Sequence, residues 1–228
     1  RYTAGKKHNE QKLPDSNEDQ KVIRTKAPPE WSTNRYGQSK TIVKDLETGQ
    51  VSKIVYIGGI NEGTIEFDDE IVYNDVIVET ISSDGESEFT VYGYPVDIFE
   101  EHYYHSATLS PDQEKIVIIG NKKIDYQKRD SPMEHVYTLD LKTFAIEKHP
   151  TTGAAPHPIY NHTTRWVGNK LRIARGLKKA QWHRPIRVDK AYLLDLEKYD
   201  WTTVDSAPEV KVNDDDDDSL SENDAYIV

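Results

Sequence analysis

One stretch of this chain combines many basic side chains with an aromatic ring. The segment 175–187 carries six basic side chains, counting its histidine, around a single tryptophan. Arginine and tryptophan contribute much of the binding energy at protein interfaces, and bases beside an aromatic ring could also pair with phosphates and stack on nucleobases. The segment therefore predicts a binding loop. Its candidate contact residues are Arg175, Lys178, Lys179, Trp182, His183, Arg184 and Arg187.

A second stretch carries the opposite charge. No Lys or Arg occurs from Ile54 to Glu114, whereas 15 acids do. Opposite fields on two parts of one domain steer and orient a binding partner. Because the net charge is -11, binding to nucleic acid is disfavoured and we expect a protein partner. One such partner would be a basic protein whose charge the acidic segments cover. The candidate contact residues in the acidic segment are Glu66, Asp68, Asp69 and Glu70.

Patterns of known catalytic and metal sites are sparse. The sequence contains no Gly-x-Ser-x-Gly, no Gly-rich phosphate loop and no His-Glu-x-x-His. It has no cysteine, which removes disulfides, thiolate ligands and a cysteine nucleophile. His102 and His105 are three residues apart and would face opposite sides of a strand, which makes a poor metal pair. We therefore expect no catalytic residue, no metal and no cofactor.

Short strands must position the two charged loops. Runs rich in β-branched and aromatic residues are bounded by Gly, Pro, Asn and Asp, as strands are. No long stretch repeats apolar residues with the helical period. The pattern predicts an all-β chain, built as a sandwich, barrel or propeller. The predicted strand cores are 54–57, 71–73, 76–78, 89–92, 116–119, 136–139, 171–173 and 191–194.

Polar segments flank this β-rich region in the chain of 228 residues. Residues 1–27 form a predicted polar N-terminal arm. Residues 207–228 form a predicted acidic C-terminal tail, with five consecutive aspartates at Asp214–Asp218. No apolar run is long enough to span a membrane. The sequence shows neither a leader nor a cysteine, so a cytoplasmic location is favoured while the compartment stays open.

The β-rich region contains an internal repeat, which is the sequence signature of repeat architectures. Three copies show a small polar residue before a strand, then an apolar strand followed by glycine, then a strand that contains tyrosine. This last strand reads Tyr-x-Leu-Asp-Leu in the second and third copies and Val-Tyr-Asn-Asp-Val in the first. The anchor residues Val72, Val136 and Ala191 are 64 and 55 residues apart. The matching segments are 35–39, 53–59 and 72–76 in the first copy, 104–108, 115–121 and 136–141 in the second, and 161–164, 170–176 and 191–196 in the third.

This pattern resembles the kelch repeat over roughly residues 28–204. The predicted repeats span about 28–94, 95–154 and 155–206, and each opens after a proline-bearing link. The sequence departs from the kelch pattern at three places. Gln38 stands where histidine is usual, the double glycine is intact only at Gly58-Gly59, and Ile146 occupies the late tryptophan position that Trp201 fills in the third copy.

The resemblance implies a kelch-like β-propeller or partial propeller of four-stranded antiparallel blades packed around a channel. Glycines would end the second strand of each blade, where the backbone turns without room for a Cβ. Tyrosine and tryptophan would fill the space between blades, and the aspartate after Tyr-x-Leu would begin a turn. His105 and His162 would lie at strand starts and bond loop backbone.

Three repeats are few, because propellers typically have four to eight blades. Either residues 1–34 and 205–228 help to close a further blade, or a second copy of the chain completes the ring as a homodimer. Kelch-like proteins of this kind are commonly adaptors or scaffolds. We therefore expect a non-enzymatic protein–protein interaction module, acting as a scaffold or an inhibitor-type binder. Two alternatives stay open: a propeller-scaffold enzyme acting on a carbohydrate, and nucleic-acid binding through the basic segment 175–187.

Overall fold

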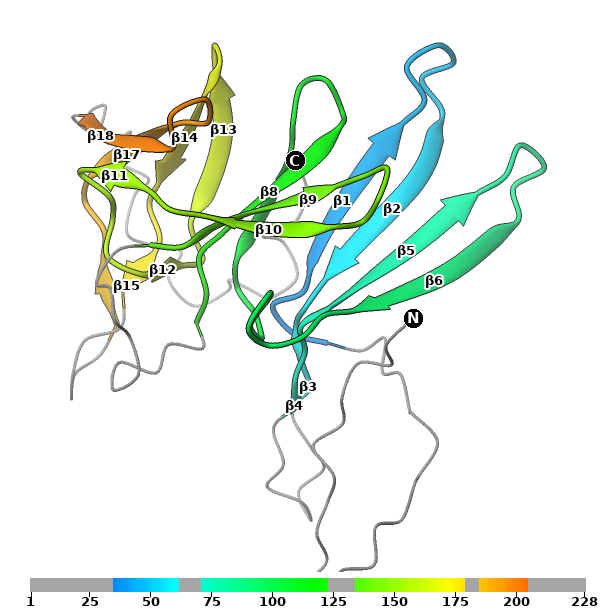
Figure 1. Ribbon diagram of the computed structural model, residues 1–228, viewed down its shortest axis with the longest axis horizontal. Coiled ribbons are helices and arrows are strands. Elements are labelled where there is room, and N and C mark those ends of the chain that lie inside the picture. Colours follow the sequence, from blue (N-terminus) through cyan, green and yellow to red (C-terminus); the bar gives the residue numbers. More distant parts are fainter. Residues whose placement is uncertain (1–34, 62–70, 123–133, 179–184, 205–228) are drawn as a thin grey trace, which may run out of the picture.

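The structure is a computed structural model that describes residues 35–61, 71–122, 134–178 and 185–204 (Figure 1). All regular structure within these ranges is β, so the prediction of an all-β chain is confirmed. Two antiparallel sheets of four strands and one five-stranded sheet account for most of it, and a two-stranded and a three-stranded sheet account for the rest. No described helix is long and apolar enough to cross a membrane.

The first sheet has the strand order β1-β2-β5-β6, and every neighbouring pair is antiparallel. Its strands are β1 (Ser39–Lys44), β2 (Val51–Ile57), β5 (Asp75–Ile81) and β6 (Ser87–Gly93). Between β2 and β5 the chain leaves the sheet to form a small antiparallel pair, β3 (Ile60–Asn61) with β4 (Ile71–Val72). This pair lies on either side of residues 62–70, which contain the predicted acidic contact residues, and Figure 1 shows it below the first sheet.

The second and third sheets repeat this plan. The second runs through β7 (Ser106–Leu109), β8 (Lys115–Ile119), β9 (Val136–Asp140) and β10 (Ile146–His149). The third runs through β13 (Thr163–Val167), β14 (Lys170–Ala174), β17 (Ala191–Asp195) and β18 (Asp200–Val204). One difference from a plain four-stranded unit is β11 (Thr152–Gly153), which lies in the link after β10 and pairs in parallel with β18.

The repeat that the sequence predicts has a defined register. The first strand of each sheet begins opposite the last residue of the second, in the pairs Ser39–Ile57, Ser106–Ile119 and Thr163–Ala174. The anchor Val72 was wrong, because it lies in β4 and pairs with Ile60 instead of joining the four-stranded sheet. The residue that matches Val136 and Ala191 is Val76, which pairs with Ile57.

The three sheets lie side by side through their first strands, with β7 in contact with both β1 and β13. The same contacts recur at both junctions. Gly37 O accepts a bond from Tyr104 N at 2.8 Å, and Tyr104 O accepts one from Asn161 N at 3.0 Å. All three residues have a left-handed φ, of 60°, 56° and 52°. Each sheet is therefore placed on its predecessor by the same backbone step.

Two hydrophobic clusters fill the junctions, one on each side of the second sheet. For this reason β8 is buried on both faces and does not show the alternation that β1 shows. Trp201 and Tyr137 are among the largest buried side chains, as the resemblance implied for the space between units. The first junction packs Val55, Ile57, Val76 and Val78 against Ile116, Ile118, Tyr137 and Leu139. The second packs Val117, Ile119 and Val136 against Leu171, Ile173, Leu194 and Trp201.

Glycine follows the second strand wherever the chain passes close to the next sheet. A Cβ on Gly58 would lie 2.2 Å from His102 O, and one on Gly120 would lie 2.6 Å from Ile159 O. Both glycines also have a positive φ, which disfavours any L side chain. The predicted reason for glycine at the end of the second strand is confirmed at these two positions.

Candidate functional site

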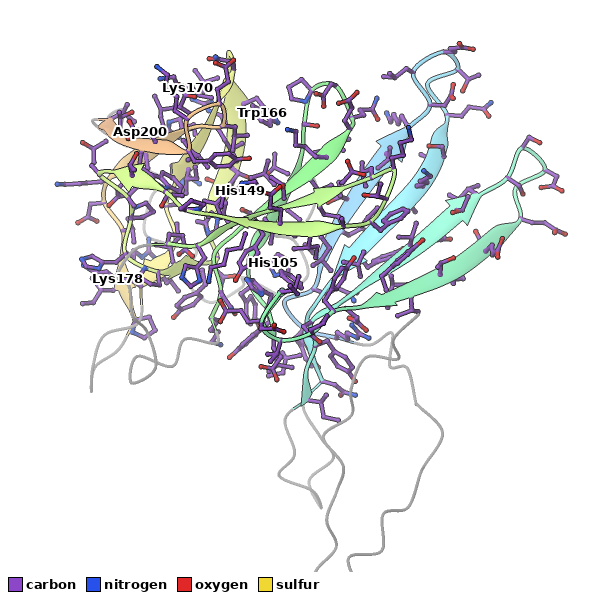
Figure 2. All side chains as sticks on the ribbon, viewed as in Figure 1. His105, His149, Trp166, Lys170, Lys178 and Asp200 are labelled. Carbon is purple, nitrogen blue, oxygen red and sulfur yellow. The ribbon has the colours of Figure 1, made fainter. Side chains whose placement is uncertain are left out.

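The described part of the basic segment borders a hollow of about 330 Å³ at the lower end of the third sheet. Its lining combines basic side chains with apolar ones. The residues that line it are His157, Ile159, Lys178, Ile186, Arg187, Val188, Asp189, Lys190 and Tyr192. Figure 2 shows Lys178 at this end of the molecule, away from Lys170, Trp166 and Asp200 at the opposite end of the third sheet.

A small antiparallel sheet positions most of these side chains. It consists of β12 (Ile159–Tyr160), β15 (Leu177–Lys178) and β16 (Ile186–Arg187), in the order β12-β15-β16. Lys178 is paired with Ile159 on one side and with Ile186 on the other, so these three side chains form one cross-strand row. Val188 N donates to Gly176 O at 3.0 Å, which ties the end of β16 back to the third sheet.

The lining of the hollow combines three cations with apolar side chains. The lining contains three basic side chains, Lys178, Arg187 and Lys190, and one acid, Asp189. Arg187 and Lys190 are exposed, whereas Ile159 is buried. Tyr192 packs edge-on against Trp201, with ring centroids 6.4 Å apart, and partial burial raises the pKa of its hydroxyl. This arrangement suits a ligand that presents a negative charge beside an apolar group. The three basic side chains can donate hydrogen bonds to the charged group, and the apolar group is removed from water by the apolar side chains of the lining.

The structure brings together only part of the predicted contact set. Lys178 and Arg187 line the hollow, as expected for a binding loop. Arg175 does not line it; this residue is exposed after β14 with a φ of 62°. The other predicted contacts lie outside the described residues: Lys179, Trp182, His183, Arg184, Glu66, Asp68, Asp69 and Glu70. Their part in binding stays a prediction.

His157 and Lys190 were missed as contact residues by the sequence reading. Lys190 closes the run of bases that starts at Arg165, so its charge was visible, but its position beside β17 depends on the third sheet. His157 comes from the proline-rich link before β12, more than 20 residues from Lys178 in sequence. Only the pairing of β12 with β15 brings the link beside the basic segment.

The histidines at the strand starts join neighbouring sheets, which corrects the expected bonds to loop backbone. His105 Nε2 lies 2.8 Å from Ser39 Oγ, and His162 Nε2 lies 2.8 Å from Ser106 Oγ. Ser106 Oγ also donates to Ile119 O, so the hydroxyl accepts from an Nε2–H. The Nδ1 atoms of both rings are buried without a partner, which fits neutral imidazoles with an unprotonated Nδ1. Burial lowers the pKa of His162 to about 4 and that of His105 well below its usual value.

Several other titratable side chains make structural hydrogen bonds. Glu100 Oε1 accepts bonds from Tyr137 at 2.9 Å and from His135 at 3.0 Å, and the bond to His135 leads the causes that lower the pKa of Glu100 to about 2. Asp140 and Asp195 each accept bonds from backbone N–H groups of the following turn, as predicted. Across the described ranges no three of these side-chain types converge as metal ligands would.

Comparison with known proteins identifies a fold and nothing finer. No protein-family model and no curated protein matches the chain. Chains of solved structures do resemble it, and one of them is the structure of YjhT, with a TM-score of 0.53 and 9% sequence identity. The match covers 79% of this chain and 53% of that chain, so the present chain spans about half the length of this structural relative. At this identity the likeness extends to the arrangement of β-sheets alone.

Proposed function

We propose that the chain is a non-enzymatic module that binds a protein partner, built as a partial, kelch-like propeller whose three four-stranded sheets act as blades. Equal contacts at the two sheet junctions and contact among β1, β7 and β13 support this assignment. In the first and third blades an excursion joins the second and third strands, and Figure 1 shows β3 and β4 of the first excursion and β15 of the third at the same end of the molecule. Such excursions are where propellers carry binding residues.

The single observation that carries the proposal is the cationic hollow. Three cations beside apolar side chains recognise an acidic side chain next to an apolar one, in an extended segment of the partner. The edge of β16 strengthens this reading, because β16 has β15 as its only described neighbour. A partner strand could add there through backbone hydrogen bonds while its acidic side chain enters the hollow.

A peptide-display experiment tests this function. The whole chain is immobilised and used to select from a library of displayed random peptides, and the binding of the selected peptides is measured by fluorescence anisotropy. We expect selected peptides to alternate acidic and apolar residues. Lys178→Glu combined with Arg187→Glu should weaken their binding by about tenfold or more, because each lost charge pair at a partly desolvated site is worth on the order of 1–2 kcal/mol.

A charge-matched control separates the hollow from general electrostatics. Lys142→Glu combined with Lys198→Glu makes the same change in net charge at two exposed turns far from the hollow. This control should bind the peptides as the unmodified chain does. Equal losses in both double variants would refute the proposed site, and selection of no peptide would refute the proposed function. Tight, salt-sensitive binding of a single-stranded oligonucleotide, lost in the first variant, would reassign the segment to nucleic acid.

A further inference from the structure

The last twelve residues of the chain, 217–228, match the sequence of β7, its turn and β8 at four identical positions. They align without a gap on residues 106–117. A hydroxyl residue also stands at the same place in both segments, where Ser219 matches Thr108. The identical positions in the tail are Leu220, Ser221, Ile227 and Val228.

The turn between β7 and β8 places specific demands on its residues. Asp112 Oδ1 accepts bonds from Ser110 Oγ and, at 3.0 Å, from Glu114 N, while Gln113 has a φ of 58°. The tail offers Asn223 at the first of these positions and Asp224 at the left-handed one. Asparagine and aspartate bond nearby backbone and tolerate a left-handed φ better than most residues. The tail therefore carries the turn chemistry as well as the strand pattern.

The spacing along the chain agrees with this repeat. Twelve residues link the end of β6 to the start of β7, and thirteen link the end of β10 to the start of β13. Twelve residues also separate Val204, where β18 ends, from Asp217. The third sheet is thus followed, at the established interval, by a segment that reads as the first two strands of another sheet.

Among the described residues, no sheet packs on one face of the third sheet, and this face carries an unusual pair. Arg165 on β13 is directly opposite Arg172 on β14. At the matching positions the second sheet has Thr108 and Val117. Like charges opposite one another destabilise a sheet, and among the described residues neither arginine makes an ion pair. A neighbour that fits this face must bring negative charge to it.

The register of the existing junctions specifies which tail residue meets this pair. Thr41 Oγ1 donates to Ala107 O at 3.2 Å, and Thr108 Oγ1 lies 2.6 Å from Thr164 Oγ1. Each contact joins the third residue of one first strand to the second residue of the next. The third residue of β13 is Arg165, and the second residue of the tail repeat is Asp218.

We propose that residues 217–228 form the first two strands of a fourth sheet, which packs on the free face of the third sheet with Asp218 paired to Arg165. The aspartate run then serves the fold, since it neutralises the arginine pair of the third sheet. It follows that the tail is not a free acidic arm for capturing basic partners. The face that includes Arg165 and Arg172 is likewise closed to acidic partners, and the hollow then remains as a cationic site among the described residues.

Disulfide trapping in the full chain tests the contact, because the sequence has no cysteine of its own. Arg165→Cys is combined with Asp218→Cys, and the oxidised protein is analysed by mass spectrometry after proteolysis. A positive control combines Thr108→Cys with Thr164→Cys, whose hydroxyl oxygens are 2.6 Å apart at an existing junction. A register control combines Arg165→Cys with Glu222→Cys in the turn of the proposed hairpin. Disulfides form only when the two Cβ atoms are about 3.5–4.5 Å apart.

We expect the Arg165–Asp218 pair to crosslink within one chain as completely as the positive control, and the register control to stay reduced. Backbone amides of 226–228 should also exchange slowly with deuterium in the unmodified chain, and faster after Arg165→Glu combined with Arg172→Glu. The proposal is overturned if the positive control crosslinks while the Arg165–Asp218 pair does not. Crosslinks only between two chains, or equal crosslinking in the register control, would also overturn it.

Discussion

Protonation of His162 should weaken the junction between the second and third sheets. The pKa of this residue is lowered to about 4 by burial, from 6.5 in an exposed chain. Its Nε2–H already donates to Ser106 Oγ, and a proton added at Nδ1 would be buried without an acceptor. Part of the residue remains exposed, but the Nδ1 atom does not. Protonation of the His162 imidazole is therefore more favourable in the unfolded chain than in the folded one.

The sign and size of the effect follow from linkage. A histidine whose pKa is lowered by folding contributes stability that is complete above pH 6.5 and is lost as the pH falls toward its folded pKa. A shift from 6.5 to about 4 corresponds to roughly 3 kcal/mol of unfolding free energy lost between pH 7 and pH 4. The pKa of His105 is lowered in the same direction, so its junction with Ser39 loses stability over the same interval.

The assay compares the unmodified chain with His162→Gln. Glutamine keeps an N–H donor for Ser106 but does not titrate, and the first sheet already has Gln38 at the equivalent position. Urea unfolding is followed by tryptophan fluorescence at pH 7, 5.5 and 4.5. The difference in unfolding free energy between the two proteins should move in favour of the variant as the pH falls. This comparison cancels the carboxylates, Glu100 included, which titrate in both proteins. If the difference stays constant from pH 7 to pH 4.5, the reasoning is wrong.

Two further predictions concern packing and charge. Gly120→Ala should lower the free energy of unfolding by about 3 kcal/mol or more, because the added Cβ would lie 2.5 Å from His162 Cε1. The control Gly85→Ala has nearly the same φ but lies in open space, so it should cost about 1 kcal/mol. Equal losses of stability in thermal unfolding of the two variants would contradict the steric argument. Asp75→Asn should cost about 3–5 kcal/mol, because Asp75 pairs with Arg35 at two oxygens and both side chains are fully buried. The matched change Asp195→Asn, at the solvent-screened pair with Lys170, should cost much less, so an equally large effect there would show that burial is not the cause.

The strands could be predicted from the sequence because their side chains report local burial. Ile116-Val117-Ile118-Ile119 reads as a strand buried on both faces, and it is β8 in the middle sheet. The anchor at Val72 failed for a physical reason. Ile71-Val72 and Val76-Ile77-Val78 both consist of isoleucine and valine, so the sequence does not distinguish them. Only the pairing of β5 with β2 shows that the run at 76–78 is the third strand of the first sheet.

The hydrogen bonds between neighbouring sheets could not be predicted from the sequence. The bond between His105 and Ser39 joins residues 66 apart, and nothing in either segment specifies the other. The same holds for the hollow, where His157 and Lys190 reach Lys178 only through the small sheet of β12, β15 and β16. Residue type predicted the charge of the site, whereas the apolar part of its lining depends on contacts between distant segments.

The two end faces of the sheet stack differ in a way that bears on closure of a ring. Among the described residues, no sheet packs on the outer face of the first sheet, where Ile42, Ile54, Glu79 and Phe89 form one cross-strand row with Ile42 and Phe89 exposed. The corresponding row of the second sheet is buried at a junction. A second copy of the chain that docked its third sheet here would bring its arginine pair toward this row and toward Lys40 on β1. Such a contact would bring the guanidinium groups beside Glu79 as well as Lys40, so the attraction to the acid opposes the repulsion from the lysine. Charge alone therefore neither selects nor excludes the homodimer that would complete the ring, and it stays a prediction.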